Sequence, residues 1–67
     1  MLEITVNGQG RALTQPMKVV HLLQQMQLGD KRVAVERNGE IVPRSQYEAV
    51  EIQPGDHFEI VVAVGGG

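Results

Sequence analysis

The sequence predicts an α+β fold in which a mixed sheet is packed on one face by one main helix. Apolar and polar residues alternate with the period of a strand near both ends of the chain. Between residues 17 and 28 the period changes to that of a helix, and Asn-Gly or Pro-Gly pairs separate the remaining segments as turns do. The last segment is apolar on both faces, which indicates a strand in the centre of the sheet.

The N-terminal segment predicts a hairpin. Residues 2–6 alternate apolar and polar side chains, the pattern of a half-buried strand. The Asn-Gly pair at 7–8 supplies the positive φ angles that a tight turn needs. The return strand, residues 9–13, is interrupted by Gly10 and Arg11, so its prediction depends mainly on the turn before it.

The next segment predicts an amphipathic helix. Thr14 can cap free amides and Pro16 is tolerated in a first turn, so we expect the helix to begin here. Its apolar residues recur at i, i+3, i+4 and i+7, and they are Val19, Leu22, Leu23 and Met26. The Leu-Gly-Asp sequence at 28–30 is expected to end it.

Shorter elements are expected between the helix and the last strand. A strand over 33–36, an Asn-Gly turn and a strand over 40–42 form a second hairpin, which Pro43 ends because it lacks an amide donor. Residues 44–49 predict a short helical turn or loop, and residues 50–52 predict a brief edge strand. The Pro-Gly-Asp sequence at 54–56 predicts a turn.

The last strand is expected over residues 57–64. One face carries Phe58, Ile60, Val62 and Val64, and the other carries Glu59, Val61 and Ala63. The order of elements is that of a ubiquitin-like β-grasp. We therefore expect one domain at 1–64 and a flexible C-terminal glycine tail at 65–67.

Size and composition exclude several classes of protein. A chain of 67 residues has no room for a second lobe that closes over a substrate, so an ordinary enzyme cleft is not expected. It has no cysteine, which excludes disulfides, thiolate zinc sites and a cysteine nucleophile. A net charge of −2 without a basic run argues against nucleic acid. No apolar run is long enough for a membrane span and residues 1–10 do not resemble a secretory signal, so we expect a cytoplasmic protein.

The three terminal glycines suggest chemistry at a carboxylate. They follow a strand and precede no helix, so they do not form a phosphate loop. Gly65 and Gly66 lack a Cβ and can thread through a narrow channel in a partner, which would deliver the carboxylate of Gly67. Adenylation would convert that carboxylate to a mixed anhydride. Attack by a persulfide and reductive release would then leave a thiocarboxylate, whereas attack by an amine would give a protein conjugate.

Three glycines also occur as a frayed end or as an engineered remnant. The preceding strand favours a functional tail, because a tail that leaves a central β-grasp strand is where a carrier mechanism needs it.

Three stretches of the chain resemble the ThiS family of sulfur carriers in thiamin biosynthesis. They are residues 35–44, which include Asn-Gly-Glu-Ile-Val-Pro-Arg at 38–44, the turn at 54–56, and the ending at 61–67. A terminal diglycine alone would also fit molybdopterin-synthase small subunits and ubiquitin-like modifiers. The middle stretch favours ThiS over both.

The resemblance implies a set of partners. A ThiF-like adenylyltransferase would activate Gly67 with ATP and magnesium, and a cysteine desulfurase or related donor would provide the sulfur. A ThiG-like thiazole synthase would take the sulfur from the thiocarboxylate. Gly66 and Gly67 correspond to the family's diglycine, whereas Gly65 extends it and leaves open how many glycines enter the partner. The carrier itself would bind no cofactor and would be a protein cosubstrate, not an enzyme.

Few other residues suggest a site. His21 and His57 lack a carboxylate at ligand spacing, which predicts a solvated or structural role and no metal site. Val61 and Ala63 either form an apolar docking patch beside the tail or are covered by Tyr47 or the 44–49 segment. Arg44 either pairs with an acidic group of a partner or hydrogen-bonds local carbonyls.

Three other functions compete with the thiamin carrier. They are a noncovalent ubiquitin-like interaction module, a protein modifier, and a carrier that serves molybdopterin synthesis.

Overall fold

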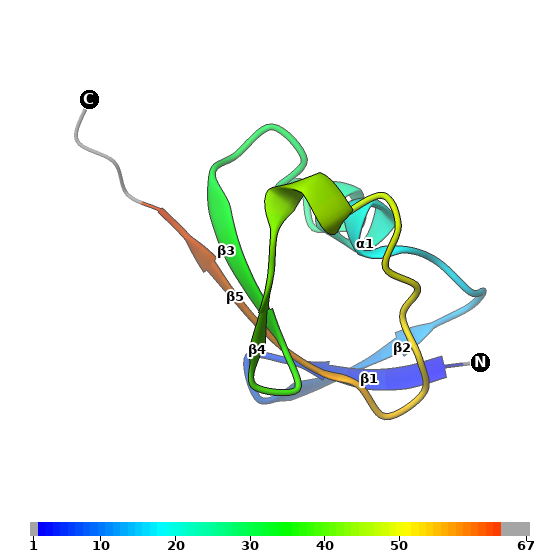
Figure 1. The fold of residues 1–67 in the computed structure, drawn as a ribbon. Coiled ribbons are helices and arrows are strands. Elements are labelled where there is room, and N and C mark those ends of the chain that lie inside the picture. The colour runs from blue at the N-terminus through cyan, green and yellow to red at the C-terminus, as the bar shows by residue number, and fades with distance from the viewer. Residues whose placement is uncertain (1, 64–67) are drawn as a thin grey trace.

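A five-stranded mixed sheet with strand order β2-β1-β5-β3-β4 is the frame of this computed structural model, which describes residues 2–63 (Figure 1). The strands are β1 (Leu2–Val6), β2 (Gln9–Leu13), β3 (Val33–Arg37), β4 (Glu40–Val42) and β5 (His57–Val62). The helix α1 (Val19–Gln25) packs against one face of the sheet, and a short 3-10 helix, η1 (Arg44–Gln46), follows β4. The predicted β-grasp fold is confirmed.

Both predicted hairpins form at their Asn-Gly pairs. In the β1–β2 hairpin the φ angles of Asn7 and Gly8 are 53° and 81°, and in the β3–β4 hairpin those of Asn38 and Gly39 are 52° and 86°. Two consecutive positive φ angles are typical of the type I′ turn, whose twist matches that of the flanking strands. These short local signals therefore set the register of both strand pairs.

The strand β5 occupies the centre of the sheet, as its sequence predicts. It pairs with β1 in parallel and with β3 antiparallel. Phe58 and Ile60 point into the core, which contains no other aromatic ring among its fully buried side chains. The remaining core residues are aliphatic or methionine, as the composition predicts, and they are Ile4, Val6, Leu13, Met17, Val19, Leu22, Leu23, Val35, Val42 and Ile52.

The helix begins later than predicted, with Lys18 as its N-cap instead of Thr14. The reason is a tertiary contact. The amide of Val19 donates to the carbonyl of Val50 at 3.1 Å, and the amide of Ile52 donates to the carbonyl of Met17 at 3.0 Å. Lys18 is thus held in extended conformation by the pairing of residues 17–19 with residues 50–52, and this pairing prevails over the local capping signal.

The same contact changes the prediction for residues 50–52. They do not form an edge strand of the sheet, because their only ladder contact among the described residues is an isolated antiparallel bridge between Lys18 and Glu51. The helix also ends before the predicted Leu-Gly-Asp sequence. Gln27 has a φ of 61°, and the amide of Leu28 donates to the carbonyl of Leu23 at 2.8 Å, which is the Schellman pattern.

The core ends at Ile60 and does not continue along β5. Val62 was expected to share the buried face of Phe58 and Ile60, but it is 41% exposed. Val64 of that predicted face lies outside the described residues. The two-sided apolar pattern at the end of β5 thus reflects exposed surface and not burial between two layers.

Candidate functional site

The C-terminal end of β5 precedes the glycine segment in the sequence, and hydrogen bonds from two neighbouring segments hold it in place. The parallel pairing with β1 covers only His57 and Phe58 of β5. At Ile60 the side chain of Asn7 replaces the missing strand. Its Oδ1 accepts from the amide of Ile60 at 2.8 Å, and its Nδ2 donates to the carbonyl of Ile60 at 3.0 Å. Asn7 thus extends the ladder by one residue beyond the end of β1.

Beyond Ile60, β5 is supported by β3. Val61 and Val62 pair with Ala34 and Val33 of β3, and the amide of Ala63 donates to the carbonyl of Arg32 at 2.8 Å. The end of β5 therefore reaches past β1 toward one side of the molecule (Figure 1). Its backbone is fixed up to Ala63 by hydrogen bonds to a neighbouring segment.

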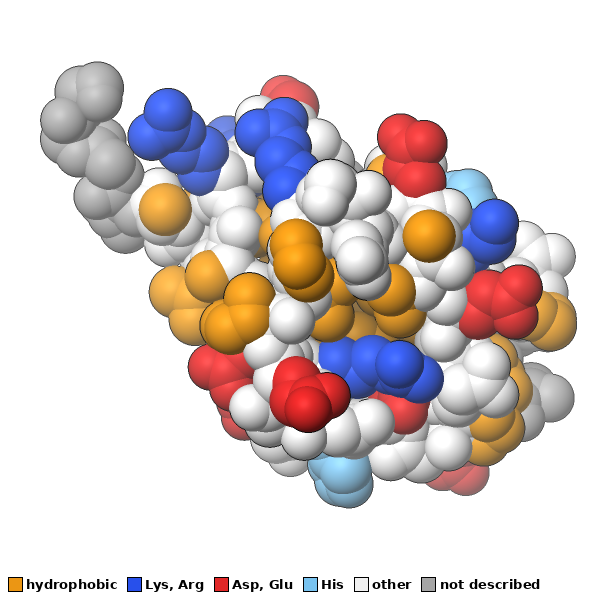
Figure 2. All heavy atoms as spheres, viewed as in Figure 1, with side chains coloured by type: hydrophobic (Ala, Val, Ile, Leu, Met, Phe, Trp, Pro, Cys, Tyr) orange, Lys and Arg blue, Asp and Glu red, His pale blue; other side chains and the backbone are white. Residues whose placement is uncertain are grey.

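The outer face of the sheet presents apolar side chains at this end. Val61 is 62% exposed and Ile41 of β4 is 66% exposed, and Ala63 is exposed as well. Figure 2 shows hydrophobic side chains gathered on the face of the molecule that it presents. Val61 is therefore not covered by Tyr47 or by the segment 44–49, and the alternative of an exposed patch holds for it. We call Ile41, Val61 and Ala63 the outer patch.

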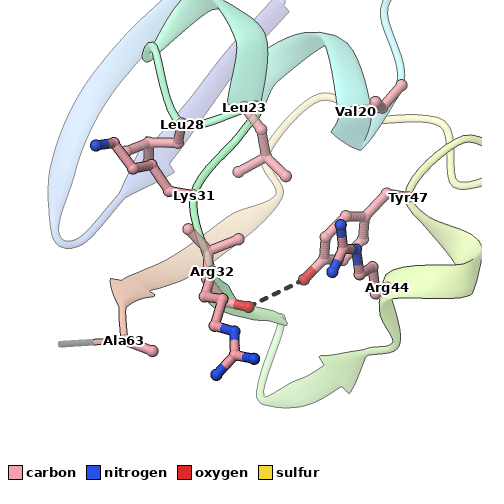
Figure 3. Close-up of a pocket in the computed structure, with 10 residues that line it drawn as sticks. Val20, Leu23, Leu28, Lys31, Arg32, Arg44, Tyr47 and Ala63 are labelled. Atoms are coloured by element: carbon pink, nitrogen blue, oxygen red, sulfur yellow. Dashed lines mark hydrogen bonds between the residues drawn. The ribbon is translucent and has the colours of Figure 1, made fainter. Parts of the chain in front are cut away.

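A pocket of about 320 Å³ lies near the outer patch, between α1, the loop that precedes β3, and η1 (Figure 3). Ala63 lines it at one side. Tyr47 forms part of its wall, and its hydroxyl donates to the carbonyl of Val33 at 3.3 Å. Arg44 lines the pocket with an exposed side chain, for which the part of the chain between residues 2 and 63 provides no hydrogen-bond partner. The expected alternative in which Arg44 bonds local carbonyls is thus not seen within residues 2–63.

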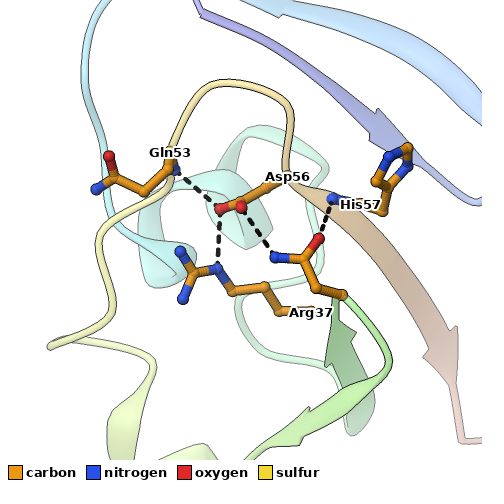
Figure 4. A network of polar contacts seen from close by, with 5 residues as sticks. Arg37, Gln53, Asp56 and His57 are labelled. Atoms are coloured by element: carbon orange, nitrogen blue, oxygen red, sulfur yellow. Dashed lines mark hydrogen bonds and ion pairs between the residues drawn. The ribbon is translucent and has the colours of Figure 1, made fainter.

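A cluster of polar side chains lies at the opposite end of β5, and it holds the predicted turn at 54–56 in place (Figure 4). Oδ2 of Asp56 accepts from Nε of Arg37 at 2.8 Å and from the amide of Gln53 at 2.9 Å. Its Oδ1 accepts from Nδ2 of Asn38 at 3.1 Å. Burial by itself raises the pKa of Asp56, but these hydrogen bonds and the charge of Arg37 together lower it below its ordinary value of 3.8.

This cluster gives a pH-dependent prediction. Because the pKa of Asp56 is lower in the folded chain, its stabilising contribution is present above about pH 3.8 and is lost as the pH falls through the folded-state pKa. Asp56→Asn should lower the free energy of unfolding by about 1–3 kcal/mol at pH 6. The NH2 group of the asparagine would replace one carboxylate oxygen and would then face N–H donors instead of accepting from them. The difference from wild type, measured by urea unfolding, should shrink at a pH below 3.8. A difference that stays constant with pH would contradict this role.

The remaining predicted site residues, Gly65, Gly66 and Gly67, lie outside the described residues. The two histidines were predicted to have a solvated or structural role. The ring of each histidine contacts one described residue: Nδ1 of His57 is 2.7 Å from Oγ1 of Thr5, 52 residues away in the sequence, and Nδ1 of His21 accepts from the amide of Lys18 at 3.2 Å. Within residues 2–63 no three His, Asp or Glu side chains are grouped so as to hold a metal ion, and no helix is long and apolar enough to cross a membrane.

Two features of this end of the molecule were not predicted from the sequence. The Asn-Gly signal indicates the turn at Asn7 but not its contact with Ile60, which lies 53 residues away. Lys31 and Arg32 were not singled out, although both line the same pocket as Arg44. Lys31 and Arg32 are adjacent in the sequence, but only the tertiary fold brings them to the same pocket as Arg44, so the sequence alone did not indicate the group.

Comparison with known proteins indicates a family. A sequence model described as the ThiS family matches residues 4–67. The sulfur carrier protein ThiS of Bacillus subtilis is 50% identical over 46 residues, which cover 69% of this chain and 70% of that protein. The crystal structure of the thiamine biosynthesis protein ThiS from Geobacter metallireducens superimposes with a TM-score of 0.83 at 30% identity, covering 98% of this chain and 100% of that one.

A longer relative matches as well. A thiazole synthase of Paramagnetospirillum magneticum is 42% identical over 66 residues, which cover 98% of this chain. This chain spans only 20% of the length of that thiazole synthase. The similarity is thus confined to a part of the longer protein that has the size of the present domain.

Proposed function

This chain belongs to the ThiS family, and we propose that it carries sulfur for thiamin biosynthesis on the carboxylate of Gly67. Its role is that of a protein cosubstrate and not of a catalyst, in keeping with the sulfur carrier of Bacillus subtilis. The observation that carries the proposal is that the family match continues through residue 67 and so includes all three glycines. The mechanism requires Gly67 to be the last residue of the mature chain.

The proposed chemistry begins with activation. A ThiF-like adenylyltransferase, using ATP and magnesium, joins AMP to the carboxylate of Gly67 and releases pyrophosphate. A persulfide from a cysteine desulfurase or related donor then attacks the acyl carbon and displaces AMP. Reduction of the sulfur–sulfur bond by a thiol leaves the thiocarboxylate on Gly67. All the sulfur comes from the donor, in agreement with a carrier that contains no cysteine.

In the second half of the cycle, a ThiG-like thiazole synthase takes the sulfur into the thiazole ring. The similarity of the whole domain to thiazole synthases supports a functional connection with that reaction. Transfer of the sulfur to the thiazole precursor breaks the C–S bond at Gly67, and an oxygen atom from the acceptor substrate or from water takes its place, so the carboxylate is regenerated and the carrier can be activated again. We place the cycle in the cytoplasm.

Docking of both enzymes is proposed to use the surface around the end of β5. An enzyme that holds Gly67 in its active site must cover the chain a few residues before it, because an extended chain advances only about 3.3 Å per residue. Val61 and Ala63 of the outer patch are exposed and lie within that reach. Gly65 and Gly66 would pass through the enzyme's channel, and Arg44 would contact the enzyme beside it.

The pathway is tested by deletion of the gene. We expect the deletion strain to require thiazole for growth and to recover when the wild-type chain is expressed. A loss of molybdenum-enzyme activity without a thiazole requirement would instead identify a molybdopterin-directed carrier. Protein conjugates that depend on Gly67 would identify a modifier, and a strain without either deficiency would favour a noncovalent interaction module.

A further inference from the structure

The pocket beside Ala63 combines an apolar floor with a cationic rim. Its floor and walls are formed by apolar or aromatic side chains from α1, the loop before β3, the first residue of β3, and the segment after η1, and these are Val20, Leu23, Leu28, Val33 and Tyr47. The volume of about 320 Å³ is enough for one or two side chains of a partner. Val20, Leu28, Val33 and Tyr47 are only partly buried, so this floor remains accessible.

Three cationic side chains surround that floor. Lys31 and Arg32 come from the loop before β3, and Arg44 comes from η1, so the basic residues around the pocket belong to more than one element (Figure 3). No acidic side chain is among the described residues that line it. The ion pair found within residues 2–63 joins Arg37 and Asp56, away from this pocket.

The location of these charges is unusual for the chain as a whole. The protein has a net charge of −2. Nevertheless, three of its six Lys and Arg residues line this one pocket. Figure 2 shows basic side chains close together at the upper left of the molecule. A local field opposite in sign to the net charge attracts an acidic surface and orients it during encounter.

The chemistry of the pocket fits a protein segment better than a small anion. Small-molecule sites orient their ligands by a few polar groups placed within the cavity. Here the hydroxyl of Tyr47 already donates to the carbonyl of Val33, and the cations are on exposed side chains at the rim. An apolar floor within a charged rim is the usual composition of a protein–protein contact.

We propose that this pocket receives an acidic segment of the activating adenylyltransferase. An apolar side chain of that segment occupies the floor, and its flanking carboxylates face Lys31, Arg32 and Arg44. Ala63 belongs to the outer patch and also lines the pocket, so the two surfaces adjoin at the end of β5 and together fix the direction in which the chain enters the enzyme. This inference rests on the proposed function, because it takes its partner from the activation step.

Charge reversal tests the proposal. The double variant Arg32→Glu, Arg44→Glu should raise the KM for the carrier in the adenylation reaction about tenfold or more at low salt, with little change in kcat. The difference from wild type should diminish as the salt concentration rises, because salt screens exposed charges. Arg11→Glu, Lys18→Glu is the matched control. It changes the net charge by the same amount, at residues that do not line this pocket. If the position of the charges at the pocket determines the affinity, the KM of this control should stay within about twofold of the wild-type value.

Equal effects of the two double variants would overturn the proposal, since net charge alone would then explain them. Far-UV circular dichroism and thermal melting establish that both variants are folded. An unchanged KM in the pocket variant would overturn it as well.

Binding without ATP separates this inference from the proposed function. We expect the adenylyltransferase alone to shift the amide NMR signals of residues 28–33 and 44–47 in the 15N-labelled chain. If these signals do not move although the enzyme binds, the pocket is not the contact. If AMP alone moves them, the occupant is a small anion and the proposal fails. A chain that binds through this pocket but is never adenylated would contradict the proposed function and leave the pocket assignment standing.

Discussion

Deletion of Gly67 is expected to abolish sulfur transfer while the domain remains folded. The deletion removes the carboxylate that is proposed to react. The new terminal carboxylate, on Gly66, would then lie one residue short of the activating site. Expressed in the gene-deletion strain, the shortened chain should fail to restore growth without thiazole. Replacement of Gly66 by Leu should have the same effect, because a branched side chain cannot pass through a channel fitted to glycine.

The core of the domain explains why its fold should survive. The buried cluster is formed entirely by residues between Ile4 and Ile60. The melting temperature of the shortened chain should therefore remain close to that of the wild type. Growth without thiazole would show that Gly67 does not carry the sulfur, and unfolding would show that the glycine segment is needed for stability. The corresponding Gly65→Leu variant tests how many of the three glycines enter the partner.

The substitution Ile60→Asp is expected to unfold the domain. The side chain of Ile60 is 5% exposed in the central strand β5 and belongs to the main core cluster. Burial of an unpaired carboxylate there should cost about 4 kcal/mol or more, which approaches the whole stability of many domains of this size. Circular dichroism and thermal melting would report the loss.

Val61→Asp is the matched control for this substitution. Val61 is the next residue along β5, but its side chain lies on the outer face and is 62% exposed. The same new carboxylate is hydrated there, so the melting temperature should change little. Similar melting temperatures for Ile60→Asp and the wild type would show that the inward face of β5 is assigned wrongly.

Local sequence signals predicted most of the fold because they specify it directly. The Asn-Gly pairs impose the turn geometry, and the alternation in β5 places Phe58 and Ile60 in the core. The start of α1 was predicted too early, because residues 17–19 pair with residues 50–52 and this contact has no local signature. A capping residue shows where a helix can begin, whereas tertiary pairing decides where it does.

The candidate site was predicted less completely than the fold. Val61, Ala63 and Arg44 were singled out from the sequence, and all three are exposed near the end of β5. The structure adds Lys31 and Arg32, which approach Arg44 because the loop before β3 and η1 meet at one pocket. Contacts between distant segments cannot be read from the spacing of residues along the chain.

Localised mass spectrometry tests the central claim most directly. The wild-type chain is incubated with ATP, magnesium, a ThiF-like adenylyltransferase, a persulfide donor and a reducing thiol, and is then digested with trypsin. The peptide from Ser45 to Gly67 contains no methionine, so exchange of oxygen for sulfur in it cannot be confused with methionine oxidation. We expect this peptide to end at Gly67 and to gain the mass of that exchange only when ATP is present. An unchanged peptide, with an adenylyltransferase that is active on its own carrier, would contradict the account and favour a noncovalent binding module.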